Sequence, residues 1–443
     1  MDPAQIFAAA VLIISYALII SEKIHRTVVA LAGGVLIIAL GPSFGLINRS
    51  IYPTGSSFVA EAVDWNTIGL LLGMMIIVGI LKDTGIFEFI AVKTAKLSKG
   101  DPVKIILLFA IITAIISAFL DNVTTVLLMA PITISIAKKL DMDPVPFLIS
   151  EIFASNIGGT ATLIGDPPNM IISSGAGLSF NEFIIHLTPI IFFVLIFSLV
   201  FLKYAFREQL SKKPENIKDI LNMNEWDMIK DYRLLKKSLS VIFLVIILFF
   251  LHSWLHLQPS TVALLGAALL LILTRQHPDK ALHQVEWSVL LFFAGIFIIV
   301  KGVEEAGLIQ KAASIAVNMT HGNLIVAMFV ILWTSAIISA IVDNIPFTVA
   351  MVPLVKSMSS SPALVSQIAH LNTNPLWWAL ALGACLGGNG TLIGASANIV
   401  VAGVSERMGH PISFKEFFKY GAPLTFISIF ISGLFLYVEI FII

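Results

Sequence analysis

The stretch SAFLDNVTTVLLMAP, residues 117–131, places an Asp–Asn pair between two apolar runs, and SAIVDNIPFTVAMVP, residues 339–353, repeats this arrangement 222 positions later. Lys104 and the pair Lys138 and Lys139 flank the first copy. Two short full spans with an external turn fit this pattern, and so does a re-entrant hairpin whose tip stops inside the membrane. The hairpin is favoured because DNVTT has no Gly or Pro to form a turn, whereas Asp and Asn can cap the returning helix.

The composition of the chain identifies its class. Of the 443 residues, 58% are hydrophobic and 12% are charged, and the mean hydropathy is +0.96, values far outside the range of soluble domains. The first residues, MDPAQIFAAAVLIISYALII, have no positive segment and no cleavage site, so they predict a membrane span rather than a signal peptide. A single cysteine excludes a disulfide framework and a thiolate metal site, and the zero net charge gives no basic surface for nucleic acid. The sequence predicts an all-α polytopic membrane protein without a metal site or cofactor.

The two halves of the chain resemble each other beyond the Asp–Asn motif. Residues 63–101 align with residues 285–323 at the same offset, and three pairs of uncommon residues match: Trp65 with Trp287, Gly73 with Gly295, and Gly85 with Gly307. Chance similarity of Leu-, Ile- and Val-rich segments would explain aliphatic matches, but not Trp, Gly, Asp–Asn and Pro in register. The sequence therefore predicts a duplication, with a first repeat at 1–206, a second repeat at 238–443, and the polar segment 207–237 as the linker between them.

Each half contains five apolar segments of spanning length in the same order. They lie near 4–21, 26–41, 66–81, 146–172 and 183–203 in the first half, and near 239–256, 260–274, 286–301, 376–402 and 421–441 in the second. The distribution of Lys and Arg assigns the linker to the cytoplasm and both termini to the outside. Because five spans reverse the polarity of the second half, the sequence predicts inverted-topology repeats, each with about five spans, one hairpin and one broken helix.

A second motif interrupts the fourth span of each half. NIGGTATLIGDPPN, residues 156–169, and CLGGNGTLIGASAN, residues 385–398, place Gly pairs, Thr and Asn inside apolar spans, so the helices must unwind there. The alternative is a kink that lets helices pack closely. The matched positions favour a binding site, where half-helix N-termini face an anionic or oxygen-bearing substrate. The predicted substrate-binding residues are Asn122, Thr124, Thr125, Asn156, Gly158, Gly159, Thr160, Thr162, Asn169, Asn344, Thr348, Gly387, Gly388, Asn389, Thr391 and Asn398.

Three acidic residues lie within these motifs. An Asp at the bilayer centre costs about 2.5–3.5 kcal/mol, so Asp121, Asp166 and Asp343 are expected to line a cavity and to bind the coupling ion, a proton or sodium. Asp121 and Asp343 have a structural alternative as helix caps. Asp166 has Ala395 at the matching position of the second half, so the symmetric architecture does not need it. Because burial penalises the charged form of a carboxyl, Asp166 is the predicted carrier of the coupling proton.

The remaining polar residues carry weaker signals. Glu151 and His186 stand near predicted span ends and are expected to face headgroups or water. A channel would need a continuous polar pore, whereas the polar residues gather at one depth in each half. An intramembrane protease would use Asp121 and Asp343 as a dyad, but no protease motif surrounds them. The sequence therefore favours a transporter that is not an enzyme and has no catalytic residues.

The succession of SAFLDNVTTVLLMAP and NIGGTATLIGDPPN resembles the arsenite-pump and P-protein branch of the ion-transporter superfamily, which also contains sodium/proton antiporters and sodium-coupled dicarboxylate and citrate carriers. The resemblance extends from residue 28 to about residue 418. It implies a homodimer in the plasma membrane, with a scaffold domain and a transport domain that moves like an elevator. The dicarboxylate carriers have Ser-Asn-Thr at their hairpin tips, whereas Asp121–Asn122 and Asp343–Asn344 stand here.

The same resemblance implies a function. For the arsenite-pump branch this is export of arsenite or antimonite against a proton gradient, in some cases with an energising ATPase subunit. With one cysteine, the chain cannot capture a metalloid through three thiolates, so hydroxyl, amide and backbone groups would have to bind it. The sodium/proton antiporter and the sodium-coupled di- or tricarboxylate carrier remain as alternatives, and the substrate is expected to be a small inorganic or carboxylate anion.

Overall fold

The computed structural model describes residues 2–21, 23–211 and 221–442, and this part of the chain contains α-helices and short 3-10 helices but no strands. Seven helical segments are long and apolar enough to cross a membrane: α1 (Pro3–Ser21), α2 with η1 (Arg26–Phe44), α4 (Trp65–Lys82), α11 (Thr188–Ala205), α13 (Tyr232–Leu251), α16 (Trp287–Glu305) and α23 (Phe414–Ile442). The predicted class of all-helical polytopic membrane protein is confirmed.

Each Asp–Asn motif lies at the bend between two apolar helices that contact each other. In the first half these are α6 (Pro102–Ser117) and α7 (Asn122–Lys139), and in the second half α18 (Leu324–Ser339) and α19 (Asn344–Ser359). Asp121 accepts a hydrogen bond from the backbone N–H of Thr124 at 2.9 Å, and Asp343 accepts one from Ile345 at 3.0 Å. Both acids therefore cap the returning helix, as the motif predicts.

The fourth predicted span is broken in both halves. In the first, α8 (Val145–Thr160) is separated from α9 (Pro167–Ala176) by residues 161–166, and in the second, α21 (Pro375–Gly387) is separated from α22 (Ser396–Arg407) by residues 388–395. Side-chain amides satisfy carbonyls that unwinding frees. Asn169 donates to Thr160 O at 3.1 Å and Thr162 O at 2.8 Å, and Asn398 donates to Gly388 O at 2.8 Å and Thr391 O at 3.0 Å. In both halves, the side-chain amide of one Asn thus satisfies the free carbonyls of the unwound segment.

Glycines at these breaks allow close helix contact. A Cβ at Gly158 would lie 2.1 Å from the carbonyl oxygen of Ala114 in α6, and one at Gly387 would lie 2.6 Å from that of Ala336 in α18. In the same way Gly159 and Gly388 pack on the backbone of their own unwound segments. The packing role considered for the Gly pairs is therefore present in both halves.

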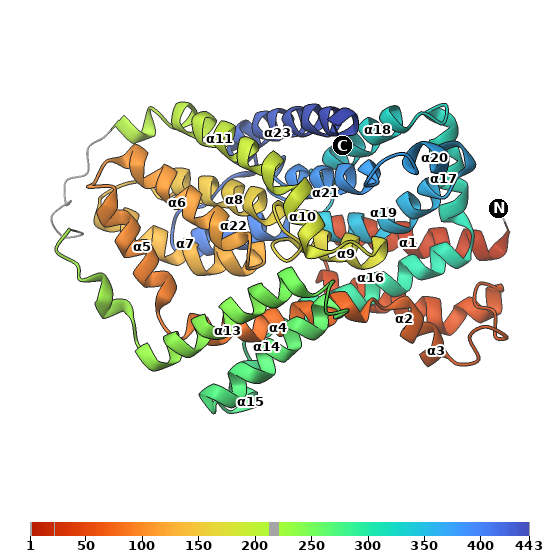
Figure 1. Cartoon of the computed structure of the whole chain (residues 1–443), viewed down its shortest axis with the longest axis horizontal. Helices are drawn as coiled ribbons and strands as arrows, with labels where there is room; N and C mark the ends of the chain where they lie inside the picture. Colours follow the sequence, from red (N-terminus) through yellow and green to blue (C-terminus); the bar gives the residue numbers. More distant parts are fainter. Residues whose placement is uncertain (1, 22, 212–220, 443) are drawn as a thin grey trace.

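Helix contacts come in matched pairs between the halves. Helix α2 packs on α16, and α14 (Pro259–Thr274) packs on α4. Similarly, α6 packs on α8 as α18 does on α21, and α7 packs on α22 as α19 does on α9. In Figure 1, α11 and α23 run along one edge of the molecule, α4, α13 and α14 lie along the opposite edge, and the broken helices lie between them.

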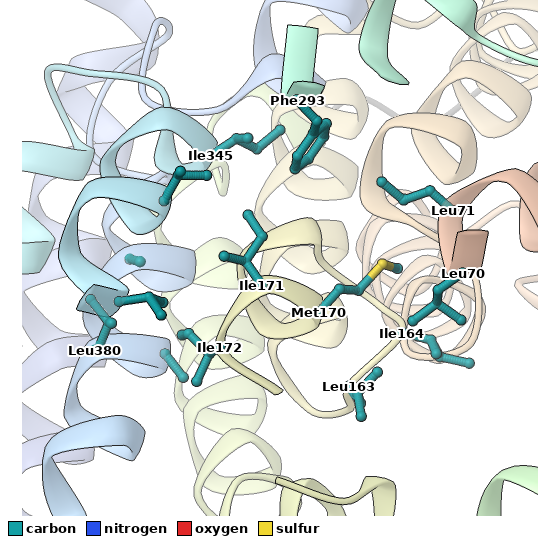
Figure 2. Packing of buried hydrophobic residues seen from close by; sticks show 14 of the residues in the cluster. Leu70, Leu71, Leu163, Ile164, Met170, Ile171, Ile172, Phe293, Ile345 and Leu380 are labelled. Carbon is teal, nitrogen blue, oxygen red and sulfur yellow. The ribbon is translucent and has the colours of Figure 1, made fainter. Parts of the chain in front are cut away.

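The side chains around α9 that face α4, α16 and α19 are apolar. Figure 2 shows Met170 of this helix facing Leu70 of α4, while Ile171 points toward Phe293 of α16 and Ile345 of α19. All five side chains are buried. The short helix beside the unwound segment thus packs on α4 and on α19, and its Ile171 also faces α16.

Shorter helices connect these elements: α3 (Gly55–Ala62), α5 (Ile86–Leu97), α10 (Phe180–His186), α15 (Pro278–Leu282), α17 (Leu308–Met319) and α20 (Pro362–Ile368). Part of the predicted linker packs on α5. Within η3 (Glu225–Met228), Glu225 pairs with Lys96 at 2.7 Å, and the ring of Trp226 packs at a tilt against Phe89 with 4.7 Å between centroids. Residues 212–220 of the linker lie outside the described residues.

One predicted span boundary and two predicted exposures are wrong. Helix α13 begins at Tyr232, before the span predicted near 239–256, because Asp231 caps it through the N–H groups of Arg233 and Leu234. Glu151 does not face headgroups or water but is 1% exposed in the middle of α8. His186 is also buried, because its imidazole pairs with Glu439 and stacks on Trp378.

Candidate functional site

The two hairpin tips meet at Asp166. The side-chain amide of Asn122, the first residue of α7, donates to Asp166 Oδ1 at 3.2 Å, and that of Asn344, the first residue of α19, lies 3.4 Å from both carboxylate oxygens. The carboxylate is fully buried and both amides are nearly so. Asp166 precedes α9 but makes no side-chain capping bond there. One carboxylate therefore joins two matched residues that are 222 positions apart in the chain.

A chain of amides extends this centre across both broken helices. Asn156 accepts from Asn122 at 3.1 Å and donates to Asn389 at 2.8 Å and Asn398 at 3.0 Å. Cys385 donates from Sγ to Asn169 Oδ1 at 3.5 Å. Both hairpins and both unwound segments thus contribute to a connected polar centre.

Three helix N-termini converge on this centre. Asn122 and Asn344 begin α7 and α19, and Asp166 directly precedes α9. Helix N-termini carry partial positive charge and free N–H groups, so they stabilise a negative group. In this structure the Asp166 carboxylate is that group. The arrangement suits a small anion or oxyacid, with hydroxyl and amide groups rather than thiolates as its partners.

The other two predicted acids differ in their surroundings. Asp121 has Thr124 as its hydrogen-bond partner, whereas Asp343 forms an ion pair with Arg26 of α2 at 3.1 Å. Ser396, the first residue of α22, donates to Asp343 and accepts from Arg26. A cavity of about 270 Å³ lies beside this cluster and reaches the ends of α1 and α2. The second tip is therefore attached to α2, and both Arg26 and Asp343 line this cavity.

The remaining predicted binding residues mostly have structural contacts. Thr162 donates to Ala118 O and Thr391 donates to Ala340 O, so each ties an unwound segment to the turn of its own hairpin. Thr160 and Thr348 each donate to a carbonyl one turn earlier in their own helices.

Two further Thr residues follow the first tip. Thr124 lines a cavity of about 60 Å³ with Lys82 and Glu286, and the Thr125 hydroxyl is buried without a hydrogen-bond partner among the described residues. Thr124 thus lines a cavity at the first tip.

Arg26, Ser396 and Cys385 are site residues that sequence reasoning did not identify. Arg26 directly precedes an apolar segment, where a basic residue is ordinary, and its matching position in the second half is Pro259. The matching position of Ser396 is Pro167. Because each of these residues occurs in one half, a comparison that looks for repeated residues does not find them. The sequence could have identified them as polar residues without a matching polar residue of the same type in the other half.

A family model described as Citrate transporter (CitMHS) matches residues 16–383. The chain belongs to the citrate transporter family. It is 42% identical over 438 residues to a protein of Mycobacterium tuberculosis described as an uncharacterized transporter, with 99% of each chain covered. It is also 38% identical to the P protein of Sus scrofa, covering 96% of this chain and 58% of that protein. The predicted relation to the P-protein branch of the superfamily is confirmed.

Solved structures extend the comparison to the fold. This citrate transporter family member is similar to the YdaH transporter of Alcanivorax borkumensis with a TM-score of 0.61, at 14% identity, covering 99% of this chain and 98% of that one. At this identity the likeness concerns the fold alone. The family and its named relatives are transporters, so the chain is a secondary transporter and not an enzyme.

Proposed function

We propose that this protein transports a small oxygen-bearing anion together with protons, and that the substrate binds between the two hairpin tips and the two unwound segments. The observation that carries the proposal is the contact of the Asp166 carboxylate with both Asn122 and Asn344. A carboxylate of the protein occupies the position where three helix N-termini favour negative charge. A substrate anion that entered this centre would have to compete with it.

Protonation of Asp166 resolves this competition. The neutral carboxyl holds the amides of Asn122 and Asn344 less strongly, because hydrogen bonds to a charged group are the stronger ones. Both amides and the helix N-termini are then available to an anion. Proton and anion therefore favour each other at this centre, which couples their movement in the same direction. Asp121 and Asp343 remain as caps, and each can hold a cation at its tip.

A second candidate is the exchange of protons for a neutral oxyacid of the arsenite type. The amide-rich lining favours it, because hydroxyl groups of such an acid can donate to Asp166 and accept from Asn122 and Asn344. Sodium/proton exchange and sodium-coupled di- or tricarboxylate transport are the remaining alternatives. They differ in which ion gradient drives substrate movement.

We further propose that the halves are inverted repeats and that movement is of the elevator type. The matched helix contacts support the repeats, with α1 to α4 and α13 to α16 as a scaffold and the hairpins and broken helices as the moving part. The apolar surroundings of Met170 and Ile171 support the movement, because apolar side chains can slide past each other at small cost (Figure 2). Polar contacts between the scaffold and the moving part would hold one end state: Arg26 with Asp343, Tyr16 with Pro346 O, and Ser174 with Asp64.

Transport assays in liposomes test the proposal. Purified protein is reconstituted with an imposed pH gradient or sodium gradient, and uptake of radiolabelled citrate, phosphate and arsenite is measured in turn. We expect one of these to accumulate with the pH gradient, and Asn344→Ala to abolish this uptake without reducing the amount of folded protein. Accumulation driven by sodium alone would contradict the proton coupling. Activity that requires ATP and a second protein would indicate the energising subunit.

Cysteine labelling tests the topology. Cys385 is fully buried, so single cysteines at Ser57 and Ser211 can be read in the natural background. We expect a membrane-impermeant maleimide to label Ser57→Cys from the outside of intact cells and Ser211→Cys only after permeabilisation. Labelling of both positions from one side would contradict the inverted repeats. The mass of the purified protein in detergent tests the homodimer.

A further inference from the structure

Glu151 is a buried acid that takes no part in the centre described above. It lies in α8, where its side chain is 1% exposed. Thr133 of α7 donates its hydroxyl to Glu151 Oε1 at 2.6 Å, whereas Oε2 is buried and has no hydrogen-bond partner among the described residues. A carboxyl group with one satisfied oxygen and one bare oxygen inside a membrane protein requires a ligand or a proton.

The second half shows that this polar pair is not needed for packing. Two matching hydrogen bonds show which positions of the two halves correspond: Ser117 donates to Ser155 O, and Ser339 donates to Ala384 O. At the positions that match Glu151 and Thr133, the second half has Leu380 and Val355, both fully buried. Leucine and valine therefore suffice at the same place in the fold. The first half retains an acid and a hydroxyl there at an energetic cost.

Among the described residues, no charged side chain forms an ion pair with Glu151. Helices α6, α7, α11, α21 and α22 pack on α8, and α23 contacts it through Phe417 and Phe153. No ionisable side chain among the described residues of these helices forms a hydrogen bond or ion pair with Glu151. The ionisable side chains of these helices are Lys104, Lys138, Lys139, Lys203, Tyr204, Cys385, Glu406, Arg407, Lys415, Glu416, Lys419, Tyr420, Tyr437 and Glu439. Its surroundings include the buried side chains of Ile134, Leu148 and Ile152. An ionised Glu151 would have one hydrogen bond in place of its hydration shell, at a cost of several kcal/mol.

The ligand that fits this site is a proton. Hard metal cations take about six or more oxygen ligands, whereas the site offers the carboxyl of Glu151 and one hydroxyl. A proton needs neither space nor further ligands. Because Thr133 belongs to α7, whose first residue is Asn122, a change of charge at Glu151 acts on the same helix that carries the first tip.

We propose that Glu151 is a second proton-binding site of the transporter, separate from Asp166, and that it exchanges one proton in each transport cycle. The proposal rests on the proposed function for the cycle, but the site itself can be tested without a substrate. The hydrogen bond from Thr133 to Glu151 links α7 to α8. Loss of the proton strengthens this bond but leaves a buried charge whose Oε2 has no partner among the described residues, so water or a cation is drawn toward the carboxylate.

Infrared spectroscopy of the full-length protein in lipid nanodiscs tests the site. The C=O stretch of protonated carboxyl groups is recorded from acidic to alkaline pH for the natural protein, Glu151→Gln and Asp166→Asn. We expect a band that disappears reversibly at alkaline pH, is missing in Glu151→Gln and remains in Asp166→Asn. Absence of such a band, or a Glu151 band that never titrates, overturns the proposal. Should Glu151→Gln fail to fold, Thr133→Val is used, and it must shift the pH at which the band disappears.

Proton counting tests the role in the cycle. Uptake of labelled citrate and of protons, read by a pH-sensitive dye, is compared in liposomes containing the natural protein, Glu151→Gln and Glu151→Leu, the latter introducing the residue of the second half. We expect both variants to move one proton fewer per citrate than the natural protein, and an unchanged ratio overturns the proposal. If the natural protein moves no citrate, protons are counted with phosphate and arsenite instead. If it moves none of the three, the proposed function is wrong, and the infrared measurement alone then decides on Glu151.

Discussion

The two hairpin tips have the same motif but different attachments. Both begin the returning helix with Asp–Asn, and both Asn side chains reach Asp166. Asp121 accepts from the backbone of its own helix, whereas Asp343 is held by Arg26 of α2 and by Ser396 of α22. The Asn residues that occur in both halves therefore make matching contacts with Asp166. Arg26 and Ser396, which occur in one half, fix the second tip to α2 and α22.

Asp166 provides the largest expected difference between the acids. Replacement by Asn removes the charge and the exchangeable proton while keeping the size of the side chain. We expect Asp166→Asn to reduce uptake driven by a pH gradient in liposomes to the background of empty vesicles. Asp121→Asn is the matched control, because Asn caps a helix about as well as Asp. It should retain most of the uptake, and equal loss in both variants would contradict the assignment of the proton to Asp166.

The ion pair at the second tip is expected to have the next largest effect. Arg26→Gln removes a charge-assisted hydrogen bond, which destabilises the observed conformation by about 1.4 kcal/mol, or roughly tenfold in population. Ile399 lines the cavity beside Arg26, so the labelling rate of Ile399→Cys reports this conformation. We expect a several-fold slower rate with Arg26→Gln. Lys82→Gln near the first tip is the control, and a similar decrease there would contradict a specific role of Arg26.

Gly85 and Gly307 are matching residues that precede α5 and α17, and replacing each in turn tests the contact of η3 with α5. Gly85 and Gly307 both have positive φ, at +84° and +70°, but a Cβ at Gly85 would lie 1.9 Å from Met228 O, whereas Gly307 faces open space. Gly307→Ala should cost about 1 kcal/mol for the backbone conformation alone. Gly85→Ala should cost more and release η3 from α5. Thermal unfolding in detergent and limited proteolysis near Met228 measure the difference, and equal melting temperatures would contradict the close contact.

The contact of η3 with α5 should show a small effect of pH. The hydrogen bond from Lys96 holds the pKa of Glu225 below its usual range. The contact is therefore fully stabilised above the usual pKa of a glutamate and weakens as the pH falls through the lowered value. Trp226 packs against Phe89, so the fluorescence difference between the natural protein and Trp226→Phe reports the contact. It should change only in acid, and Glu225→Gln should remove this change. A change near neutral pH would contradict the assignment.

Local signals explain which features the sequence predicts. The caps at Asp121 and Asp343 and the breaks at residues 161–166 and 388–395 depend on side chains within a few positions, and they lie where the motifs indicate. The start of α13 was missed because Asp231 caps it from within a polar segment. The burial of Glu151 could not be predicted, because the sequence shows how far a residue lies from the end of a span but not which helices surround it. Exposure of one side chain in a membrane protein depends on neighbours far away in the chain.

The sequence by itself determined that this chain is a helical membrane transporter with two similar halves, because hydropathy, caps and Gly or Pro breaks act locally and occur twice. Only the tertiary structure decided which polar residues meet. Asn122, Asp166 and Asn344 come from three helix ends, and Arg26 reaches Asp343 across 317 positions of the chain. Such contacts depend on how the helices pack, since helix packing brings side chains within hydrogen-bond distance irrespective of their separation in sequence. The same packing encloses Glu151 with Thr133 in the first half and leaves an apolar pair, Leu380 and Val355, in the second.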